Sequence, residues 1–237
     1  MNKTSIEWTE NTWNPITGCT QVSDGCKNCY AKRMAKRLEA MGNPRYVNGF
    51  KLTIHEDLFI QPLLKKKSQV IFVCSMSDLF HEDVSLDIID QLFDIMEMST
   101  QHIFQVLTKR SHRLLEYSQR RHIPDNVWVG VSLESEKVIH RLHDLNSTIA
   151  KTKFLSCEPL LSDIETCDFK DIDWVVVGGE SGPYAREIKE EWVINIRDNC
   201  QRQGVKFFFK QWGGVNKKKN GRLLEGKIYD DMPEVNY

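Results

Sequence analysis

Residues 14–34 read NPITGCTQVSDGCKNCYAKRM and place Cys19, Cys26 and Cys29 within eleven residues. Proline and glycine residues punctuate this stretch, which indicates a turn-rich loop. Two residues separate Cys26 from Cys29, so both sulfurs can bind one ion or cluster. After Cys29 the apolar residues recur with the period of a helix, which predicts a helix with Tyr30 and a set of longer apolar side chains on one face. The apolar residues of that face are Met34, Leu38 and Met41.

The number of clustered cysteines decides which kind of metal site the loop predicts. A closed zinc site or an electron-transfer cluster usually takes four protein ligands, often as two pairs. This loop supplies three, and the other cysteines, Cys74, Cys157, Cys167 and Cys200, stand alone in the sequence. Three ligands leave one coordination position for an external ligand, as chemistry at a metal requires. A structural zinc ion completed by a histidine or a lone cysteine is the alternative.

The length of the chain indicates a single domain of residues 1–237. Its composition indicates no strong overall electrostatic field. The chain has 32 basic and 33 acidic residues, so no overall charge draws it towards nucleic acid or membrane. No apolar run approaches the roughly twenty residues that span a bilayer, and residues 1–8 lack a signal-peptide core. An odd number of cysteines, seven, is typical of a reducing compartment. We therefore expect a cytoplasmic protein that does not bind membranes.

From residue 70 onward, short β-branched or aromatic runs end in polar phrases and precede helical periods. Strands are predicted at 70–74, 103–107, 127–131, 153–156, 174–177 and 205–209, with a short first strand at 12–16 and another at 50–55. Helices are predicted at 86–99, 135–145 and 190–203. Apolar strands joined by helices indicate a parallel sheet covered by helices. Right-handed crossovers favour a partial or complete (β/α) barrel of about six to seven strands, with an open doubly wound sheet as the alternative.

In either architecture, the carboxyl ends of the strands meet at one mouth, where the active site lies. Each predicted strand leaves through a polar phrase, which favours an enzyme. The candidate side chains are Ser75, Asp78, Lys109, Ser132, Glu134, Cys157, Glu158, Gly178, Gly179, Glu180 and Trp212, with Arg110, Arg186, Lys210 and Gln211 beside them.

Glu158 and Glu180 are the candidate acid–base residues. Two neighbouring carboxylates would raise one pKa and create a proton donor, although salt bridges at the rim of the core are the alternative. Lys109 is a candidate to contact a carboxylate or phosphate, unless it is a charge at a helix entry. The thiol of Cys157 would donate a hydrogen atom or complete a metal site, unless it is a small buried hydrophobe.

Three further residues are candidates for binding a nucleotide. Ser132 and Glu134 follow a strand, and Glu134 would hold ribose hydroxyls. Trp212 offers a flat surface on which an adenine or a substrate base stacks.

The cysteine loop resembles the signature of radical S-adenosylmethionine (radical SAM) enzymes. This resemblance implies that three thiolates hold a [4Fe-4S] cluster whose fourth iron binds SAM, and that one electron then yields a 5′-deoxyadenosyl radical. Six residues separate Cys19 from Cys26, where most members of that family have three. The aromatic residue also follows the last cysteine, as Tyr30, instead of preceding it.

The same resemblance implies further cofactor contacts at the strand ends. Ser75 and Asp78 occupy the position that receives the SAM ammonium group. Gly178, Gly179 and Glu180 are similar to the family's SAM-binding phrase, but they follow about the sixth strand instead of the second. A tight turn with φ > 0 is the alternative for the paired glycines.

A closer resemblance covers nearly the whole chain. It is to an uncharacterised family of phage and prophage proteins that carry this three-cysteine loop. The phrases that carry it are NTWNP at 11–15, SMSDLF at 75–80, LTKR at 107–110, GVSLE at 130–134, CEPLL at 157–161, GGESG at 178–182 and FKQWG at 209–213.

These observations predict a radical SAM enzyme that modifies or repairs a substrate, with nucleic acid or a nucleotide favoured. It would require an electron donor such as flavodoxin or ferredoxin, and a dedicated partner protein is compatible with the family. Lysines at 217–219 and Arg222, within a basic C-terminal extension of 213–237, would contact a nucleic-acid backbone or form a solvated turn. One alternative is a zinc- or Fe-S-stabilised nucleic-acid-binding phage protein without catalysis. Another is a SAM-independent hydrolase that uses Glu158 and Glu180.

Overall fold

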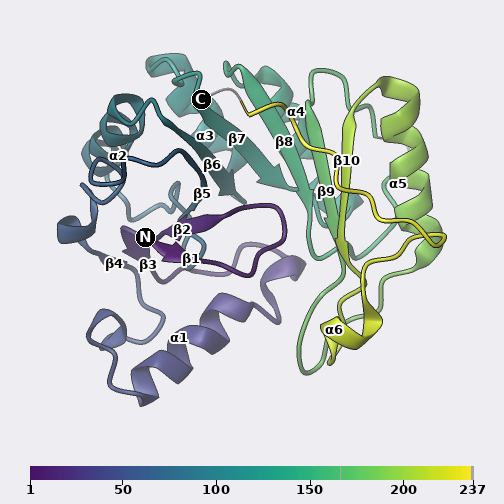
Figure 1. Ribbon diagram of the computed structural model, residues 1–237, viewed down its shortest axis with the longest axis horizontal. Helices are drawn as coiled ribbons and strands as arrows, with labels where there is room; N and C mark the ends of the chain where they lie inside the picture. Colours follow the sequence, from purple (N-terminus) through teal and green to yellow (C-terminus); the bar gives the residue numbers. More distant parts are fainter. Residues whose placement is uncertain (166, 236–237) are drawn as a thin grey trace.

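The computed structural model describes residues 1–165 and 167–235, and its centre is a curved sheet of seven parallel strands (Figure 1). In spatial order these are β2 (Asn11–Trp13), β5 (Gln69–Val73), β6 (His102–Thr108), β7 (Val127–Ser132), β8 (Thr152–Cys157), β9 (Trp174–Gly178) and β10 (Lys206–Gln211). Strand β1 (Asn2–Lys3) pairs antiparallel with β2 at the edge. Spatial order follows chain order and β10 does not close onto β1 in the sheet that these residues form, so the predicted partial (β/α) barrel is confirmed.

The main helices cover the outer face of this sheet (Figure 1). They are α2 (Leu86–Met98), α3 (Ser111–Arg120), α4 (His140–Ser147) and α5 (Glu190–Gln203), while α1 (Tyr30–Ala40) and α6 (Lys217–Asn220) lie at the mouth. Single turns of 3-10 helix occur at Asp24–Cys26, Pro44–Tyr46, Glu56–Leu58 and Glu136–Val138. Within the described residues, no helix is long and apolar enough to span a bilayer.

Two predicted strands are shorter than expected. The first, β2, ends at Trp13 because Pro15 has no N–H to donate to a ladder. Residues 50–55 contribute only β4 (Thr53–Ile54), which pairs antiparallel with β3 (Ile16–Thr17). This small ribbon holds the start of the cysteine loop against the segment before β5. Helix α3 was not predicted from the sequence, because its only apolar residues, Leu114, Leu115 and Tyr117, are too few to give a clear helical period.

Both faces of the sheet are buried, as is typical of parallel strands. On the concave face an aromatic cluster fills the interior, and Trp8 packs against Phe72 with ring centroids 4.8 Å apart and against Trp174 at 5.9 Å. Trp128, Phe154 and Phe208 complete this cluster. Because the aromatic cluster fills the lower interior, open space remains at the carboxyl ends of the strands.

On the predicted apolar face of helix α1 only Leu38 is half-buried, against the cluster that includes Ala31 and Ala35. The helix packs through Ala31 and Ala35, and leaves Tyr30 51%, Met34 42% and Met41 69% exposed. Small residues let the helix approach closely, so the larger side chains lie along the mouth of the barrel.

Candidate active site

A cavity of ≈ 810 Å³ lies at the carboxyl ends of the strands. Polar residues that follow the strands line one side, and α1 with the cysteine loop lines the other. Trp8 and Phe72 contribute to its floor, and Tyr30, Met34 and Phe50 give an apolar wall. The cavity therefore lies where the topology of the fold predicts an active site.

The three predicted metal-ligating cysteines, Cys19, Cys26 and Cys29, are free thiols that line this cavity, and each is partly exposed. The turn before Cys26 depends on Gly25, because a Cβ there would lie 2.9 Å from Oε1 of Glu134. Ser23 donates a hydrogen bond to the same carboxylate. The cysteine loop is thus packed directly on the end of β7.

Glu134 supports the loop from below instead of facing the cavity. Its side chain is fully buried, and its Oε2 lies 2.8 Å from Nη1 of Arg141. A carboxylate engaged by Ser23 and Arg141 is not available to ribose hydroxyls, so the structure does not support the role predicted for Glu134. Neighbouring Ser132 does line the cavity.

Asp78 accepts four hydrogen bonds, and these bind together the loops that follow β5 and β6. The donors are the N–H groups of Phe80 and Lys109 at 3.0 Å, Oγ1 of Thr108 at 2.7 Å and Nη1 of Arg110 at 3.0 Å. A carboxylate has about four acceptor positions, so this one is saturated. The resemblance predicted that Asp78 receives the SAM ammonium group. The structure instead shows Asp78 as an anchor for Arg110, with no acceptor position left free.

Arg110 connects this anchor to the cysteine loop. Its Nη1 lies 3.5 Å from Sγ of Cys19, its Nη2 lies 2.9 Å from Oγ1 of Thr20, and its Nε donates to the carboxylate of Glu82. Burial raises the pKa of Cys19 to about 11, Asp78 adds to this effect, and Arg110 opposes it. The sequence placed Arg110 among the candidates without revealing this connection, which depends on three segments far apart in the chain.

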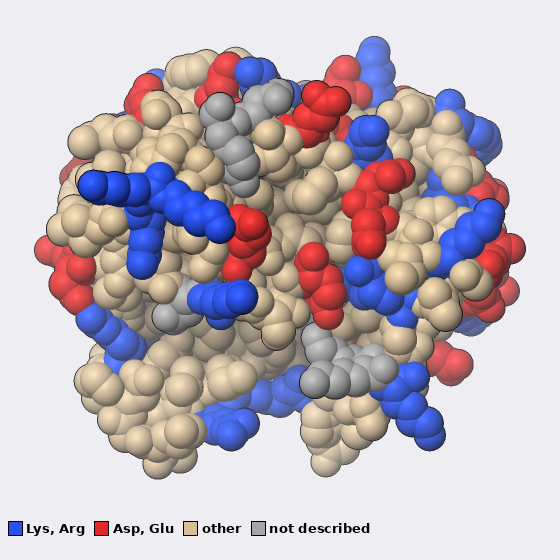
Figure 2. Space-filling view, in the orientation of Figure 1, with Lys and Arg blue, Asp and Glu red and all other residues tan. Residues whose placement is uncertain are grey.

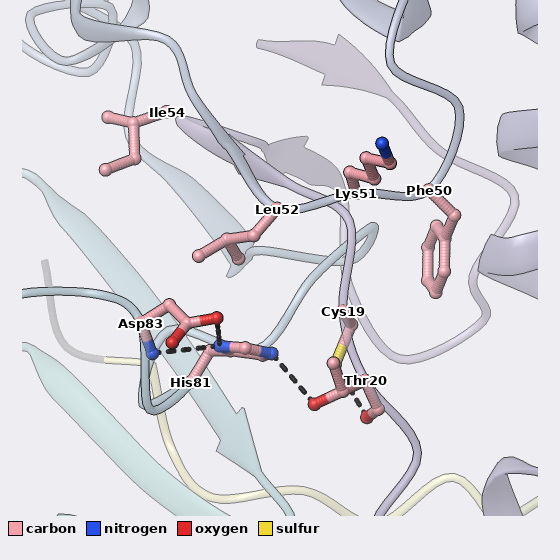
Figure 3. A pocket seen from close by; sticks show the side chains of 8 residues that line it. All are labelled: Cys19, Thr20, Phe50, Lys51, Leu52, Ile54, His81 and Asp83. Atoms are coloured by element: carbon pink, nitrogen blue, oxygen red, sulfur yellow. Dashed lines mark hydrogen bonds and ion pairs between the residues drawn. The ribbon is translucent and has the colours of Figure 1, made fainter.

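A second, shallower pocket of ≈ 610 Å³ lies beside Cys19 (Figure 3). Phe50, Leu52 and Ile54 line one side, and His81 lies opposite them. The N–H of Asp83 donates to Nδ1 of His81 at 3.1 Å, so Nε2 carries the proton that bonds to Oγ1 of Thr20 at 2.9 Å. Burial is the main cause that lowers the pKa of His81, which keeps this arrangement neutral.

Glu158 and Lys210 form an ion pair that lines the main cavity. Nζ of Lys210 lies 3.0 Å from Oε1 of Glu158, and the two side chains are 17% and 14% exposed. Oε2 of Glu158 accepts from Nε1 of Trp8 and Oγ of Ser156, both at 3.3 Å. Trp8 was not a predicted site residue, because nothing in residues 1–10 indicates that the N-terminal segment packs inside the barrel.

Glu180 forms its own ion pair and does not act with Glu158 as a carboxylate pair. Arg186 donates Nη2 to its Oε1 at 2.6 Å and Nε to its Oε2 at 2.9 Å, and Asn28 adds a third side-chain bond at 2.9 Å. Although burial opposes it, these bonds lower the pKa of Glu180 to about 2. The prediction that one of the two carboxylates has a raised pKa is therefore wrong for Glu180, and the salt-bridge alternative holds.

The paired glycines serve close packing. Neither Gly178 nor Gly179 has a positive φ, so the turn proposed for them is absent. A Cβ on Gly178 would lie 2.7 Å from Oε1 of Glu158, and one on Gly179 would lie 2.0 Å from the carbonyl oxygen of Trp212. Gly178 thus makes room for the Glu158 carboxylate, and Gly179 lets two backbone segments touch.

Two other predicted residues are not part of the cavity lining. Cys157 has no exposed surface and packs in the outer core, where burial raises the pKa of its thiol. Trp212 packs against Phe209 with ring centroids 4.7 Å apart, and its Nε1 donates to the carbonyl of Leu223. Strand β8 directs Cys157 to the helix-covered side, so the structure does not support a hydrogen-atom donor there.

Ser75 and Lys109 do line the cavity, as predicted. Oδ1 of Asn14 accepts two hydrogen bonds, one from Oγ of Ser75 at 3.1 Å and one from the N–H of Met76 at 3.0 Å. Asn14 belongs to the NTWNP phrase and fixes the loop after β5, a role that the sequence did not reveal.

The geometry of the donor atoms bears on the kind of metal group that the loop would hold. Across residues 1–165 and 167–235, no three His, Cys, Asp or Glu side chains converge as ligands of a single ion. A zinc ion requires such convergence, whereas the thiolates of a cubane cluster bind three different irons and lie farther apart. Three free thiols on one cavity wall supply the number of ligands that a cubane cluster with one open iron takes.

Comparisons with known proteins identify a family and a fold. A model of the family described as "Protein of unknown function (DUF5131)" matches residues 3–233. No curated protein matches the sequence. A single-residue mutant of spore photoproduct lyase, a radical SAM enzyme, has a similar structure with a TM-score of 0.57 at 12% identity, over 89% of this chain and 78% of that one.

Spore photoproduct lyase complexed with dinucleoside spore photoproduct gives a TM-score of 0.52 at 13% identity, over 85% of this chain. The chain spans 63% of the lyase chain in that complex. At these identities the similarity establishes the half-barrel fold alone.

Proposed function

This chain belongs to the DUF5131 family, and we propose that it is a radical SAM-type enzyme that modifies or repairs a substrate, with nucleic acid or a nucleotide as the favoured class. The observation that carries the proposal is the position of Cys19, Cys26 and Cys29 on the wall of a cavity at the carboxyl ends of a half-barrel. The fold shared with a lyase that is complexed with a dinucleoside photoproduct supports the substrate class.

In this proposal the three cysteines hold a [4Fe-4S] cluster. Bound there, the cluster would pass one electron from an external reductant to SAM, so that SAM would split into methionine and a 5′-deoxyadenosyl radical able to take a hydrogen atom from the substrate. The protein's residues bind, orient and shield the reactants. Arg110 positions Cys19 through a hydrogen bond to its sulfur, and hydrogen bonds to ligand sulfurs are among the factors that set a cluster's potential.

Apolar surface limits the access of water to part of the cavity. Tyr30, Met34 and Phe50 present apolar surface on one side, and the aromatic cluster beneath Trp8 closes the floor. A bound substrate that covered the open side would complete the exclusion of solvent, which protects a radical and strengthens polar contacts inside.

Glu158 and Lys210 provide the polar contacts at the floor. Lys210 is a donor and Glu158 an acceptor, so together they match a substrate or cofactor group that carries an acceptor beside a donor. Ser75 and Ser132 offer hydroxyl groups at neighbouring strand ends and are our candidates for contacts to SAM.

The test is anaerobic purification followed by iron, sulfide and zinc analysis, with EPR of the reduced protein recorded with and without SAM. We expect about four irons per chain, a reduced-cluster signal that SAM perturbs, and 5′-deoxyadenosine as a product. An electron donor such as flavodoxin or ferredoxin should support turnover. One zinc ion and no iron would instead indicate a metal-stabilised binding protein without catalysis. Activity that survives full exposure to oxygen would favour the SAM-independent hydrolase.

A further inference from the structure

The loop that follows β9 holds a tyrosine where the backbone favours glycine. Residues 182–185 form a turn in which the N–H of Ala185 donates to the carbonyl of Gly182 at 3.1 Å. Pro183 occupies the second position and Tyr184 the third, with φ of 66° at Tyr184. Proline at the second position and a positive φ at the third characterise a type II turn, whose third position is normally glycine or asparagine. Tyr184 therefore costs stability at this position.

No packing contact compensates for this cost. The Tyr184 residue is 88% exposed. Its ring makes no hydrogen bond or ring contact with the residues that the structure describes. A strained backbone that presents an unpacked aromatic ring is an observation from which a role in binding can be inferred.

The loop is nevertheless held firmly against the cysteine loop and α1. Asn28 donates to the carbonyl of Tyr184 at 2.9 Å, and Nη2 of Arg33 donates to the carbonyl of Ser181 at 2.8 Å. On its other side, the N–H of Gly182 donates to the carbonyl of Gly214 at 3.0 Å. Ser181 and Gly182 line the cavity, so the backbone of Tyr184 is held near its rim and the ring extends into solvent.

Helix α1 carries exposed positive charge, of which Arg37 lies on the side of the same rim. Lys32, Lys36 and Arg37 are exposed, and none pairs with a carboxylate among the residues placed in the structure. Arg37 lies three residues from Met34 and seven from Tyr30, so it shares the face of α1 that borders the cavity. Figure 2 shows Lys and Arg side chains on both sides of the hollow between α1 and α6. The charge is local, because the whole chain is nearly neutral.

We propose that α1 and Tyr184 together bind single-stranded nucleic acid beside the cavity. A base that flanks the target nucleotide stacks on Tyr184, and Arg37 contacts a phosphate. The inference rests on the proposed function and specifies its substrate as a flexible single strand or an extruded nucleotide. Stacking on an exposed ring combined with basic side chains is how single strands are bound without sequence preference. A cavity of ≈ 810 Å³ holds an extruded nucleotide but not a duplex.

The test measures fluorescence anisotropy of a labelled twelve-nucleotide single-stranded DNA, and of the same sequence as a duplex, with the full chain as purified. The variant Tyr184→Gly suits the turn, so we expect it to unfold at the same or a higher temperature. We expect its affinity for the single strand to fall about tenfold, while Tyr184→Phe binds within about twofold of the wild type because it keeps the aromatic face.

The charged face is tested by the variant Arg37→Gln. It should weaken binding and reduce the slope of log affinity against log salt by about 0.7. Lys206→Gln is the matched control, since Lys206 is exposed at the amino-terminal end of β10, away from the cavity, and should bind as the wild type does.

Two results would overturn the inference: undiminished binding by the stable Tyr184→Gly variant, or no binding of the single strand by the wild type at low salt. The second would point to a protein partner for Tyr184. Neither readout requires a cluster or SAM. If the protein bound the oligonucleotide through Tyr184 but contained no iron, only the radical mechanism would be contradicted. If it contained iron and cleaved SAM but did not bind the oligonucleotide, only this inference would be contradicted.

Discussion

Arg186 and Glu180 form a two-pronged ion pair at the start of the loop after β9, with Nη2 2.6 Å from Oε1 and Nε 2.9 Å from Oε2. Nη1 of Arg186 also donates to the carbonyl of Asp24 at 3.0 Å, so the pair joins this loop to the cysteine loop. The ion pair therefore connects the proposed ligands Cys26 and Cys29 to the end of a central strand.

This pair predicts a stability loss in acid. The pKa of Glu180 is about 2 in the folded chain against an ordinary value of 4.5, so its contribution is complete above about pH 5 and is lost as the pH falls towards 2. Glu180→Gln should lower the free energy of unfolding by about 3 kcal/mol at pH 7 and by much less near pH 2.5. Urea unfolding at both pH values measures this difference. The control Glu187→Gln replaces an exposed neighbouring carboxylate, so it should change the free energy of unfolding little at either pH.

The two adjacent glycines should respond differently to alanine. At Gly179 the added Cβ would meet a backbone carbonyl, so Gly179→Ala should cost about 3 kcal/mol of unfolding free energy. At Gly178 it would meet only the end of the Glu158 side chain, which can move, so the cost should stay below about 1 kcal/mol. Thermal unfolding distinguishes the two variants. Equal losses would contradict the packing roles assigned here, and Gly178→Ala should lower activity because Glu158 is displaced from Lys210.

Arg110→Lys should loosen the cysteine loop. A lysine cannot reproduce the fork that reaches Asp78, Glu82, Thr20 and Cys19 together, and it leaves the buried Asp78 carboxylate short of a partner. We expect a loss of about 3 kcal/mol of unfolding free energy and fewer irons retained per chain after anaerobic reconstitution. Arg120→Lys, at the half-exposed Asp90 pair, is the matched control and should cost less than about 1 kcal/mol with no change in iron content.

Iron binding should depend on the cavity cysteines and not on the core cysteines. Cys26→Ser should remove most of the iron and abolish the EPR signal of the reduced protein, because a hydroxyl is a poor ligand for a cluster. Cys200→Ala removes a thiol that is fully buried in the outer core, so it should lower stability while the iron content is retained. Equal iron content in the two variants would exclude the ligand set proposed here.

The half-barrel was predictable because the local sequence of each central strand indicates a buried strand. The run Trp174–Gly178 is apolar throughout and is followed by a polar phrase, and a strand buried on both faces requires that pattern. The presence of three cysteines on one wall of the cavity was also predictable, since the spacing of Cys26 and Cys29 is a local property. In contrast, the buried face of α1 could not be predicted, because Ala31 and Ala35 are less hydrophobic than the methionines beside them.

Partners of charged residues could not be read from the sequence. Glu158 and Glu180 look equivalent, each following a strand, but Lys210 approaches one and Arg186 the other. Asp78 and Glu134 resemble free acceptors in the sequence, yet Arg110 and Arg141 occupy them. The pKa of a carboxyl depends on charges within a few ångströms, and only folding brings those charges together.

The sequence by itself determined the alternation of strands and helices, the parallel sheet and the cluster of three cysteines. These features follow from local periodicity and spacing, which act within about twenty residues. Contacts between distant segments place Trp8 inside the barrel, place Cys157 outside the cavity and leave Tyr184 exposed near its rim. Those outcomes depend on which distant segments meet, and such contacts are set by packing and hydrogen bonding across the whole chain.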